Sequence, residues 1–209
     1  MRDPIGEAVD WVRNGGLLAY PTETVWGLGA DARSAASLER LQRWKGRDGS
    51  TPVSILVSDA AELPALGFEV TQVAERLASA LWPGPMTLVL HCRSEFARGV
   101  ARDDGAVGVR CSSHPLCGAI ARRLAMAGLG PITATSLNNS GSHAARTLEQ
   151  AREACRSGDS PPRLLDVDGA EAGGGTESTV IDATGAALEV LRWGALTPED
   201  LEPIVGSLR

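Results

Sequence analysis

The sequence has little of what a membrane-bound or exported protein needs. No apolar run in its 209 residues approaches the roughly 20 residues that a bilayer-spanning helix requires. The N-terminal stretch MRDPIGEAVD also lacks the apolar segment of a signal peptide. We therefore expect a cytoplasmic protein that has no membrane partner.

Metal-binding patterns are missing as well. The four cysteines form no CxxC pair, and the three histidines are scattered along the chain without the spacing of a zinc site. In a cytosolic chain, cysteines of this kind are typically reduced and buried. We expect no metal ion held by protein ligands.

Positive charge is scarce. The net charge of −6 argues against a protein that binds nucleic acid regardless of sequence, although it is compatible with a local basic groove. Of the 20 basic residues, 19 are arginine and only Lys45 is lysine. Either a lone lysine falls at this position by chance, or the position needs a mobile point charge.

Apolar periodicity predicts helices and strands that alternate along the whole chain. The expected helices cover 5–13, the stretch from the N-cap Ser34 to about 44, a segment after the N-cap Thr71, 115–127, 147–156 and a short segment opened by Thr197. The expected strands cover 17–20, 53–57, 86–90, 106–110, 131–135, a short piece near 164, 178–182 and 188–192. This alternation favours one α/β domain, residues 1–209, with a largely parallel or mixed sheet.

The stretch LLAYPTETVWGLGADA, residues 17–32, begins as a buried strand and then becomes polar. If the chain stays extended after Tyr20, Thr22 and Thr24 point to one side and Glu23 to the other. Glycines at alternate positions, Gly27 and Gly29 in this stretch, leave room for a ligand or another backbone to approach. A polar turn with glycines at positive φ explains the same residues, and both interpretations stay open.

A second cluster, RWKGRDGSTP, carries Lys45 and Arg47 at the end of a predicted helix. The helix macrodipole alone accounts for cations at this end. Alternatively, a lysine point charge beside an arginine fork suits a polyphosphate. Neither the GxxxxGK[ST] pattern of a P-loop nor the GxGxxG pattern of a dinucleotide fold accompanies the pair.

Further polar groups follow predicted strands. Ser136 and Asn138 end one strand, and they either bind a ligand or close a turn. A glycine-rich loop leads to Ser178, and Arg110 and Arg192 each end an apolar run. No histidine-based triad and no paired-carboxylate site is recognisable. The pattern suits a reaction that needs positioning and charge stabilisation, such as attack on a phosphate of a bound nucleotide.

In this order, the motifs YPTETVWGLGADA, KGR, LWPGPMTLVL, VGVR, TSLNNSG, STVID and LRWGA resemble the YrdC/TsaC family of threonylcarbamoyl-AMP synthases. The resemblance covers about residues 5–205 and implies the short, single-domain form. It implies a twisted mixed α/β sheet flanked by helices, with a concave groove for ligands. The chain departs from the family pattern at Trp26, at Thr51, at Cys111-Ser112, at Leu137 and in the segment 143–145.

The resemblance also implies a nucleotidyltransferase reaction. L-threonine, bicarbonate and ATP give threonylcarbamoyl-AMP and pyrophosphate, with Mg²⁺ carried by the nucleotide and no protein-ligated metal. A separate complex then transfers the threonylcarbamoyl group to tRNA. The residues that match ATP-binding positions are Lys45, Arg47, Ser136, Asn138 and Arg192, with Lys45 and Arg47 as the catalytic pair. The residues that match L-threonine-binding positions are Thr24, Arg110 and Ser178.

Two other functions stay open at this point. One is a double-stranded RNA-binding module that uses the groove without catalysis, although the net charge of −6 and an aromatic content of 4% speak against it. The other is a paralogue that makes a related carbamoyl-adenylate from a different amine, which the altered segment 142–145 keeps open.

Overall fold

A computed structural model describes residues 3–47, 51–158, 160–168 and 170–206. The strands are β1 (Leu18–Tyr20), β2 (Gly27–Gly29), β3 (Ser54–Val57), β4 (Met86–His91), β5 (Ala106–Cys111), β6 (Thr133–Ser136), β7 (Arg163–Leu164), β8 (Thr179–Asp182) and β9 (Glu189–Arg192). The helices are α1 (Pro4–Arg13), α2 (Ala35–Lys45), α3 (Gln72–Leu81), α4 (Pro115–Met126), α5 (Leu148–Ala154) and α6 (Pro198–Val205), with a short 3₁₀ helix at Ala60–Glu62.

The strands form a single sheet in the order β7-β1-β2-β6-β3-β5-β4-β8-β9. Parallel pairs join β1 to β7, β3 to β5 and β4 to β8. The remaining neighbours are antiparallel. The mixed sheet predicted from the sequence is confirmed.

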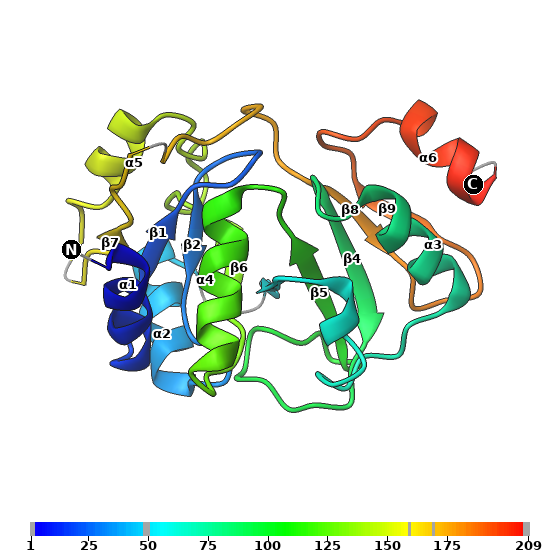
Figure 1. Ribbon diagram of the computed structural model, residues 1–209, viewed down its shortest axis with the longest axis horizontal. Helices are drawn as coiled ribbons and strands as arrows, with labels where there is room; N and C mark the ends of the chain where they lie inside the picture. Colours follow the sequence, from blue (N-terminus) through cyan, green and yellow to red (C-terminus); the bar gives the residue numbers. More distant parts are fainter. Residues whose placement is uncertain (1–2, 48–50, 159, 169, 207–209) are drawn as a thin grey trace.

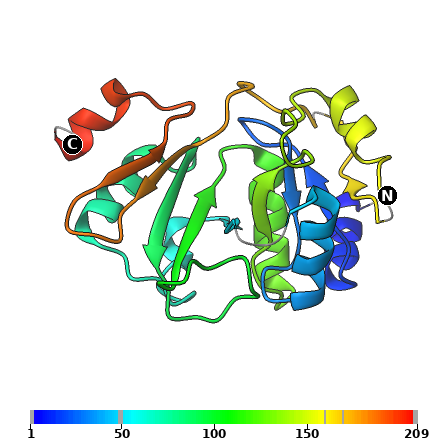
Figure 2. The ribbon, with the colours of Figure 1, turned by 180° about the vertical axis from the view of Figure 1, so that it is seen from behind.

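Helices cover both faces of the sheet (Figures 1 and 2). On one face, α1 packs against α4, and their apolar residues form a core with Leu18 and Tyr20 of β1. Ala19 of β1 and Leu17, which precedes the strand, belong to the second and larger core, to which α2 and α3 contribute. This division follows from the period of two in a strand, which sends neighbouring side chains to opposite faces.

Side-chain caps fix where several helices begin. The predicted N-caps Ser34 and Thr71 are confirmed, because each hydroxyl accepts a hydrogen bond from a backbone N–H three residues later. Thr147 does the same for α5, in a capping box with Gln150. At α6, the carboxylate of Asp200 accepts from the backbone N–H of Thr197 at 2.8 Å.

The two glycines of β2 make room for a side chain of the protein itself. Tyr20 lies directly opposite Gly27 in the β1–β2 pair. A Cβ at Gly27 would lie 2.8 Å from Cε2 of Tyr20, and one at Gly29 would lie 2.8 Å from Cδ1 of Ile132. The room expected beside these glycines is therefore filled by the Tyr20 ring and by Ile132.

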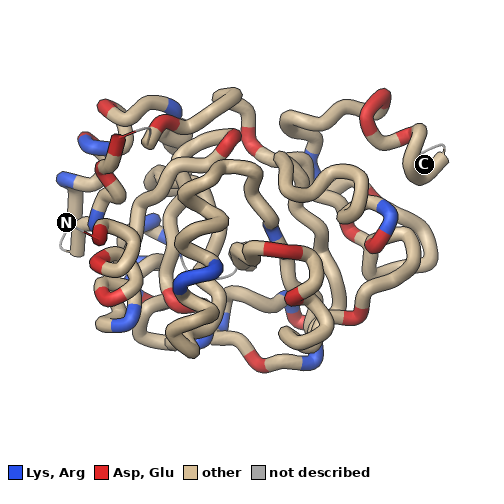
Figure 3. The backbone as a smooth tube through the Cα atoms, viewed as in Figure 1, with Lys and Arg blue, Asp and Glu red and all other residues tan. Residues whose placement is uncertain are grey.

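Within the described ranges, no helix has both the length and the apolar character needed to cross a membrane. Acidic and basic residues are interspersed along the backbone tube (Figure 3).

Candidate functional site

The main cavity has a volume of about 440 Å³. Every site residue predicted from the sequence except Lys45 lines it, namely Thr24, Arg47, Arg110, Ser136, Asn138, Ser178 and Arg192. Thr51, Thr87 and Arg102 line it too. Segments far apart in the sequence thus place hydroxyls and guanidinium groups around one space.

Lys45 lies behind the cavity wall. Its side chain is fully buried, and its ammonium group donates to the carbonyl oxygen of Ser136 at 2.5 Å and to that of Asn138 at 3.0 Å. A third bond goes to Oδ1 of Asn138 at 3.1 Å. Burial, followed by repulsion from Arg47, lowers the pKa of Lys45 from 10.5 to about 7. The lysine therefore holds the segment that carries Ser136 and Asn138.

The Ser136–Asn138 segment is also fixed from within. The Ser136 hydroxyl bonds to Oδ1 of Asn138 at 2.6 Å, and Nδ2 of Asn138 donates to the carbonyl oxygen of Ser142 at 2.6 Å. The backbone N–H of Ser140 donates to the carbonyl oxygen of Lys45 at 2.8 Å, which joins the end of α2 to the loop after β6. The structure thus confirms that these residues close a turn. They also line the cavity, and their binding of a ligand stays a prediction.

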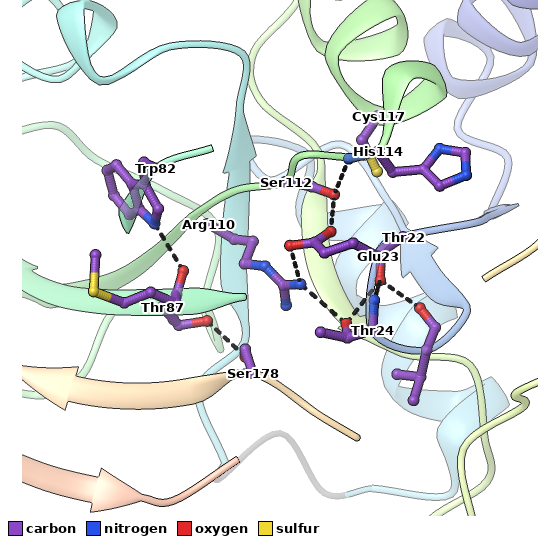
Figure 4. Close-up of polar contacts among 12 residues, drawn as sticks. Thr22, Glu23, Thr24, Trp82, Thr87, Arg110, Ser112, His114, Cys117 and Ser178 are labelled. Carbon is purple, nitrogen blue, oxygen red and sulfur yellow. Dashed lines mark hydrogen bonds and ion pairs between the residues drawn. The ribbon is translucent and has the colours of Figure 1, made fainter. Parts of the chain in front are cut away.

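Arg110 of β5 reaches the segment after β1 (Figure 4). Its Nη2 atom donates to Oε1 of Glu23 at 2.9 Å and to Oγ1 of Thr24 at 3.0 Å. The prediction that Glu23 and Thr24 point to opposite sides is wrong, because the chain bends after Pro21 and both side chains meet one guanidinium group. Sequence reasoning assigned no role to Glu23, since its partner lies 87 residues away.

The hydroxyls of the same bend have a defined hydrogen-bond direction. Thr22 Oγ1 donates to the carbonyl oxygen of Val25 at 2.6 Å, which uses its only hydrogen. In the contact of 2.8 Å between the Thr22 and Thr24 hydroxyls, Thr24 must therefore be the donor. Thr24 is left with an acceptor lone pair beside Arg110, because Arg110 uses the other.

Ser178 lies across the cavity from this bend, at the start of β8 (Figure 4). Its hydroxyl and that of Thr87 are 2.9 Å apart. Arg192 of β9 donates through Nη2 to the carbonyl oxygen of Ser178 at 2.9 Å, and its Nη1 lies 2.8 Å from Oε2 of Glu177. The Arg192 side chain is thus held at the cavity edge by the segment that carries Ser178.

The glycine-rich loop before Ser178 is pinned to the bend. The backbone N–H groups of Gly173 and Gly175 donate to the carbonyl oxygens of Thr22 and Thr24, each at 2.9 Å. A Cβ at Gly173 would lie only 2.5 Å from the carbonyl oxygen of Glu23, so only glycine permits this approach. The sequence analysis identified the loop but not these backbone contacts, because they join segments about 150 residues apart.

Arg102 is a cavity residue that the sequence analysis did not identify. Its Nη1 atom lies 2.5 Å from Oδ2 of Asp182, and it also pairs with Asp104. The hydrogen bond from Arg102 lowers the pKa of Asp104 to about 2. No local motif signals this arginine, because Asp182 comes from a strand 80 residues away.

The cysteines lack the character of nucleophiles. Cys111 and Cys117 are buried, whereas Cys92 and Cys155 are partly exposed. Burial raises the pKa of Cys111 to about 11 and that of Cys117 to about 12, so both stay protonated near neutral pH. Among the residues that the structure describes, no group of three or more His, Cys, Asp or Glu side chains could hold a metal ion.

The family model of Sua5, YciO and YrdC, described as telomere recombination, matches residues 10–194. The chain belongs to the Sua5/YciO/YrdC family. Its relatives include the threonylcarbamoyl-AMP synthase of Pyrococcus abyssi, which is 36% identical over 203 residues, or 97% of this chain and 57% of that relative. The threonylcarbamoyl-AMP synthase of Bacillus subtilis is 32% identical over 209 residues, or 99% of this chain and 58% of that relative.

The fold of this Sua5/YciO/YrdC chain is similar to solved structures. The crystal structure of P. abyssi Sua5 complexed with L-threonine matches with a TM-score of 0.86 and 33% identity, over 100% of this chain and 60% of that one. This chain therefore spans less than two thirds of the length of the Pyrococcus and Bacillus relatives.

Proposed function

We propose that this chain is an L-threonylcarbamoyladenylate synthase, which forms threonylcarbamoyl-AMP and pyrophosphate from L-threonine, bicarbonate and ATP. The observation that carries the proposal is the shared cavity of about 440 Å³, in which Thr24 and Arg110 accompany Arg47, Ser136 and Asn138. A carboxylate and a polyphosphate both need guanidinium and hydroxyl donors. Relatives that bear the name of this activity support the same assignment.

In the proposed reaction, Arg110 binds the carboxylate of L-threonine, and Thr24 accepts a hydrogen bond from a donor on the same molecule. The threonine amine and bicarbonate form a carbamate with loss of water. A carbamate oxygen then attacks the α-phosphorus of ATP, and the bond to pyrophosphate breaks. Because the carbamate is already a nucleophile, the protein needs no strong base and acts mainly by positioning both substrates.

Charge develops on the departing pyrophosphate. We assign Arg47, Ser136, Asn138 and Arg192 to the phosphates and ribose of ATP, since each of them lines the cavity. Lys45 does not line the cavity, and it supports the nucleotide site indirectly by fixing the carbonyl groups of Ser136 and Asn138. This makes Lys45 a positioning residue in the proposal, whereas Arg47 touches the nucleotide.

The donor set of the cavity fits a metal ion that arrives with the nucleotide better than one held by protein ligands. Among the described cavity-lining residues, Glu177 is the one carboxylate, and it pairs with Arg192. Mg²⁺ bound to ATP would neutralise phosphate charge. The product would then serve a separate complex that modifies an adenosine of tRNA in the cytoplasm.

Mass spectrometry tests the proposal directly. The purified chain is incubated with ATP, Mg²⁺, bicarbonate and L-threonine, and pyrophosphate release is followed in parallel. We expect an adenylate that requires both threonine and bicarbonate. An adenylate formed from another amine in a substrate panel would point to a paralogue, and strong salt-dependent RNA binding without any adenylate would point to an RNA-binding module.

A further inference from the structure

Glu23 is held at both oxygens of its carboxylate. Oε1 accepts from Nη2 of Arg110 at 2.9 Å, and Oε2 accepts from the hydroxyl of Ser112. Ser112 in turn accepts from the backbone N–H of His114 at 3.2 Å, at the start of α4. The carboxylate therefore has a fixed position next to Arg110 (Figure 4).

The Glu23–Arg110 pair is well shielded from solvent. The side chains are 17% and 10% exposed, respectively. At such burial, salt and water screen the two charges much less than they screen a surface pair. The guanidinium group is therefore largely neutralised before any ligand binds. Its Nε atom is buried and has no hydrogen-bond partner among the described residues.

A neutralised cation has a consequence for the ligand it can bind. A simple anion placed against Arg110 also meets the nearby negative charge of Glu23, which cancels much of the attraction. A zwitterion avoids this loss, because its ammonium group is attracted to Glu23 while its carboxylate contacts Arg110. Thr24 fits the same ligand, because its free lone pair accepts from a donor such as an ammonium group.

We propose that Glu23 is a specificity-determining residue, which makes the Arg110 part of the cavity select a zwitterionic amino acid over simple carboxylates and phosphates. Glu23 does this without lining the cavity, because its charge offsets that of Arg110 and also attracts an ammonium group placed beside Arg110. The cavity thereby separates zwitterionic L-threonine from ATP, since the anionic phosphates of ATP are disfavoured at Arg110. This inference rests on the proposed amino-acid substrate and adds the reason why that substrate binds where it does.

The test compares two ligands that differ only in the amine. L-threonine is a zwitterion, and (R)-3-hydroxybutyrate is the same molecule without the ammonium group. Calorimetry measures the Kd of each ligand for the wild type and for Glu23→Gln, which keeps an acceptor for Arg110 but removes the charge. The matched control is Glu69→Gln, because Glu69 forms an exposed pair with Arg93 at the same distance of 2.9 Å.

We expect wild type and Glu69→Gln to prefer L-threonine strongly. In Glu23→Gln the preference, expressed as the ratio of the two Kd values, should fall about tenfold or more, as expected for loss of one charge within a few ångströms. The Kd of a non-hydrolysable ATP analogue should not weaken, because loss of the Glu23 charge removes a repulsion of phosphate near Arg110. The melting temperature should fall, because the substitution leaves the shielded Arg110 cation without its charged partner. Ser112→Ala keeps the charge of Glu23 but removes the hydrogen bond that fixes its carboxylate. This variant should lower the ratio about two- to threefold.

Several outcomes would overturn the inference. The first is an unchanged ratio in Glu23→Gln, including the case in which both ligands weaken equally, which indicates a structural role only. If Glu23→Gln does not fold, an unchanged ratio in Ser112→Ala overturns it instead. The proposed function fails separately, when the wild type binds threonine with the expected preference yet forms no adenylate.

Discussion

The ammonium group of Lys45 lies 2.5 Å from the carbonyl oxygen of Ser136, although the two residues are 91 positions apart in the sequence. This contact ties the last residue of α2 to the last residue of β6. The lone lysine of the chain therefore stabilises the geometry of the Ser136–Asn138 segment from the interior of the protein.

The burial of Lys45 predicts how stability depends on pH. The folded pKa of Lys45 is about 7, against 10.5 for the ordinary side chain, so between these values the unfolded chain binds more protons. The free energy of unfolding should therefore rise with pH from about 7 to 9, by no more than about 1.4 kcal/mol per pH unit. Chemical denaturation of wild type and Lys45→Met measures this difference, and equal slopes in both proteins would contradict the prediction.

The pH range of this comparison is limited by the buried thiols. Unfolded cysteines ionise near a pKa of 9.0, whereas Cys111 and Cys117 have folded pKa values of about 11 and about 12. Above about pH 9 the thiols ionise in the unfolded chain but stay protonated in the folded chain. The free energy of unfolding therefore falls again as the pH rises further. Measurements below the ionisation of the unfolded thiols therefore isolate the contribution of Lys45.

Arg47 should matter for the reaction and little for the fold. It lines the cavity just beyond α2, so Arg47→Ala should reduce pyrophosphate release about 100-fold through loss of a charge-assisted contact to phosphate. Arg43 lies in the last turn of the same helix and is exposed, which makes Arg43→Ala the matched control. Comparable losses in the two variants would assign the effect to the charge of the helix end.

Arg110→Lys tests whether the planar guanidinium group, with its several N–H donors, is needed to bind the amino acid. Arg110 reaches Glu23 and Thr24 through one nitrogen, and the guanidinium group retains further donors for a carboxylate. A lysine ammonium at this position cannot keep this geometry. We expect the KM for L-threonine to rise about 10- to 100-fold while the KM for ATP changes less than about threefold. A parallel rise in both KM values would refute a role confined to the amino acid.

Gly27→Ala should destabilise the protein through a clash. The new Cβ would lie 2.8 Å from the buried Tyr20 ring, and overpacking of this kind costs about 1–3 kcal/mol. Gly118→Ala is the control, since that glycine lies within α4 and a Cβ there would meet only the flexible Arg122 side chain. Thermal unfolding should show a lower melting temperature for Gly27→Ala, and no decrease for Gly118→Ala.

Elements with a clear apolar period and a capping residue could be predicted from the sequence, as α2 with Ser34 and α3 with Thr71 demonstrate. The strand β2 could not, because Gly-Leu-Gly has almost no side-chain pattern and exists through its pairing with β1 and β6. Most of the cavity residues could be predicted as polar groups near strand ends, and Arg47 as a cation just beyond a helix. Glu23 and Arg102 were missed, since their roles depend on partners 87 and 80 residues away.

The strand β6 lies between β2 and β3, both of which come from the first third of the chain. Its Thr133 hydroxyl accepts from the backbone N–H of Ala30, 103 residues away. Closing a sheet over such a separation is slow, because most of the chain must be ordered before this pairing contributes. During synthesis, the cavity therefore completes late: Arg47 emerges 89 residues before Ser136, which β6 places beside Gly27, and the cavity residues Ser178 and Arg192 emerge later still.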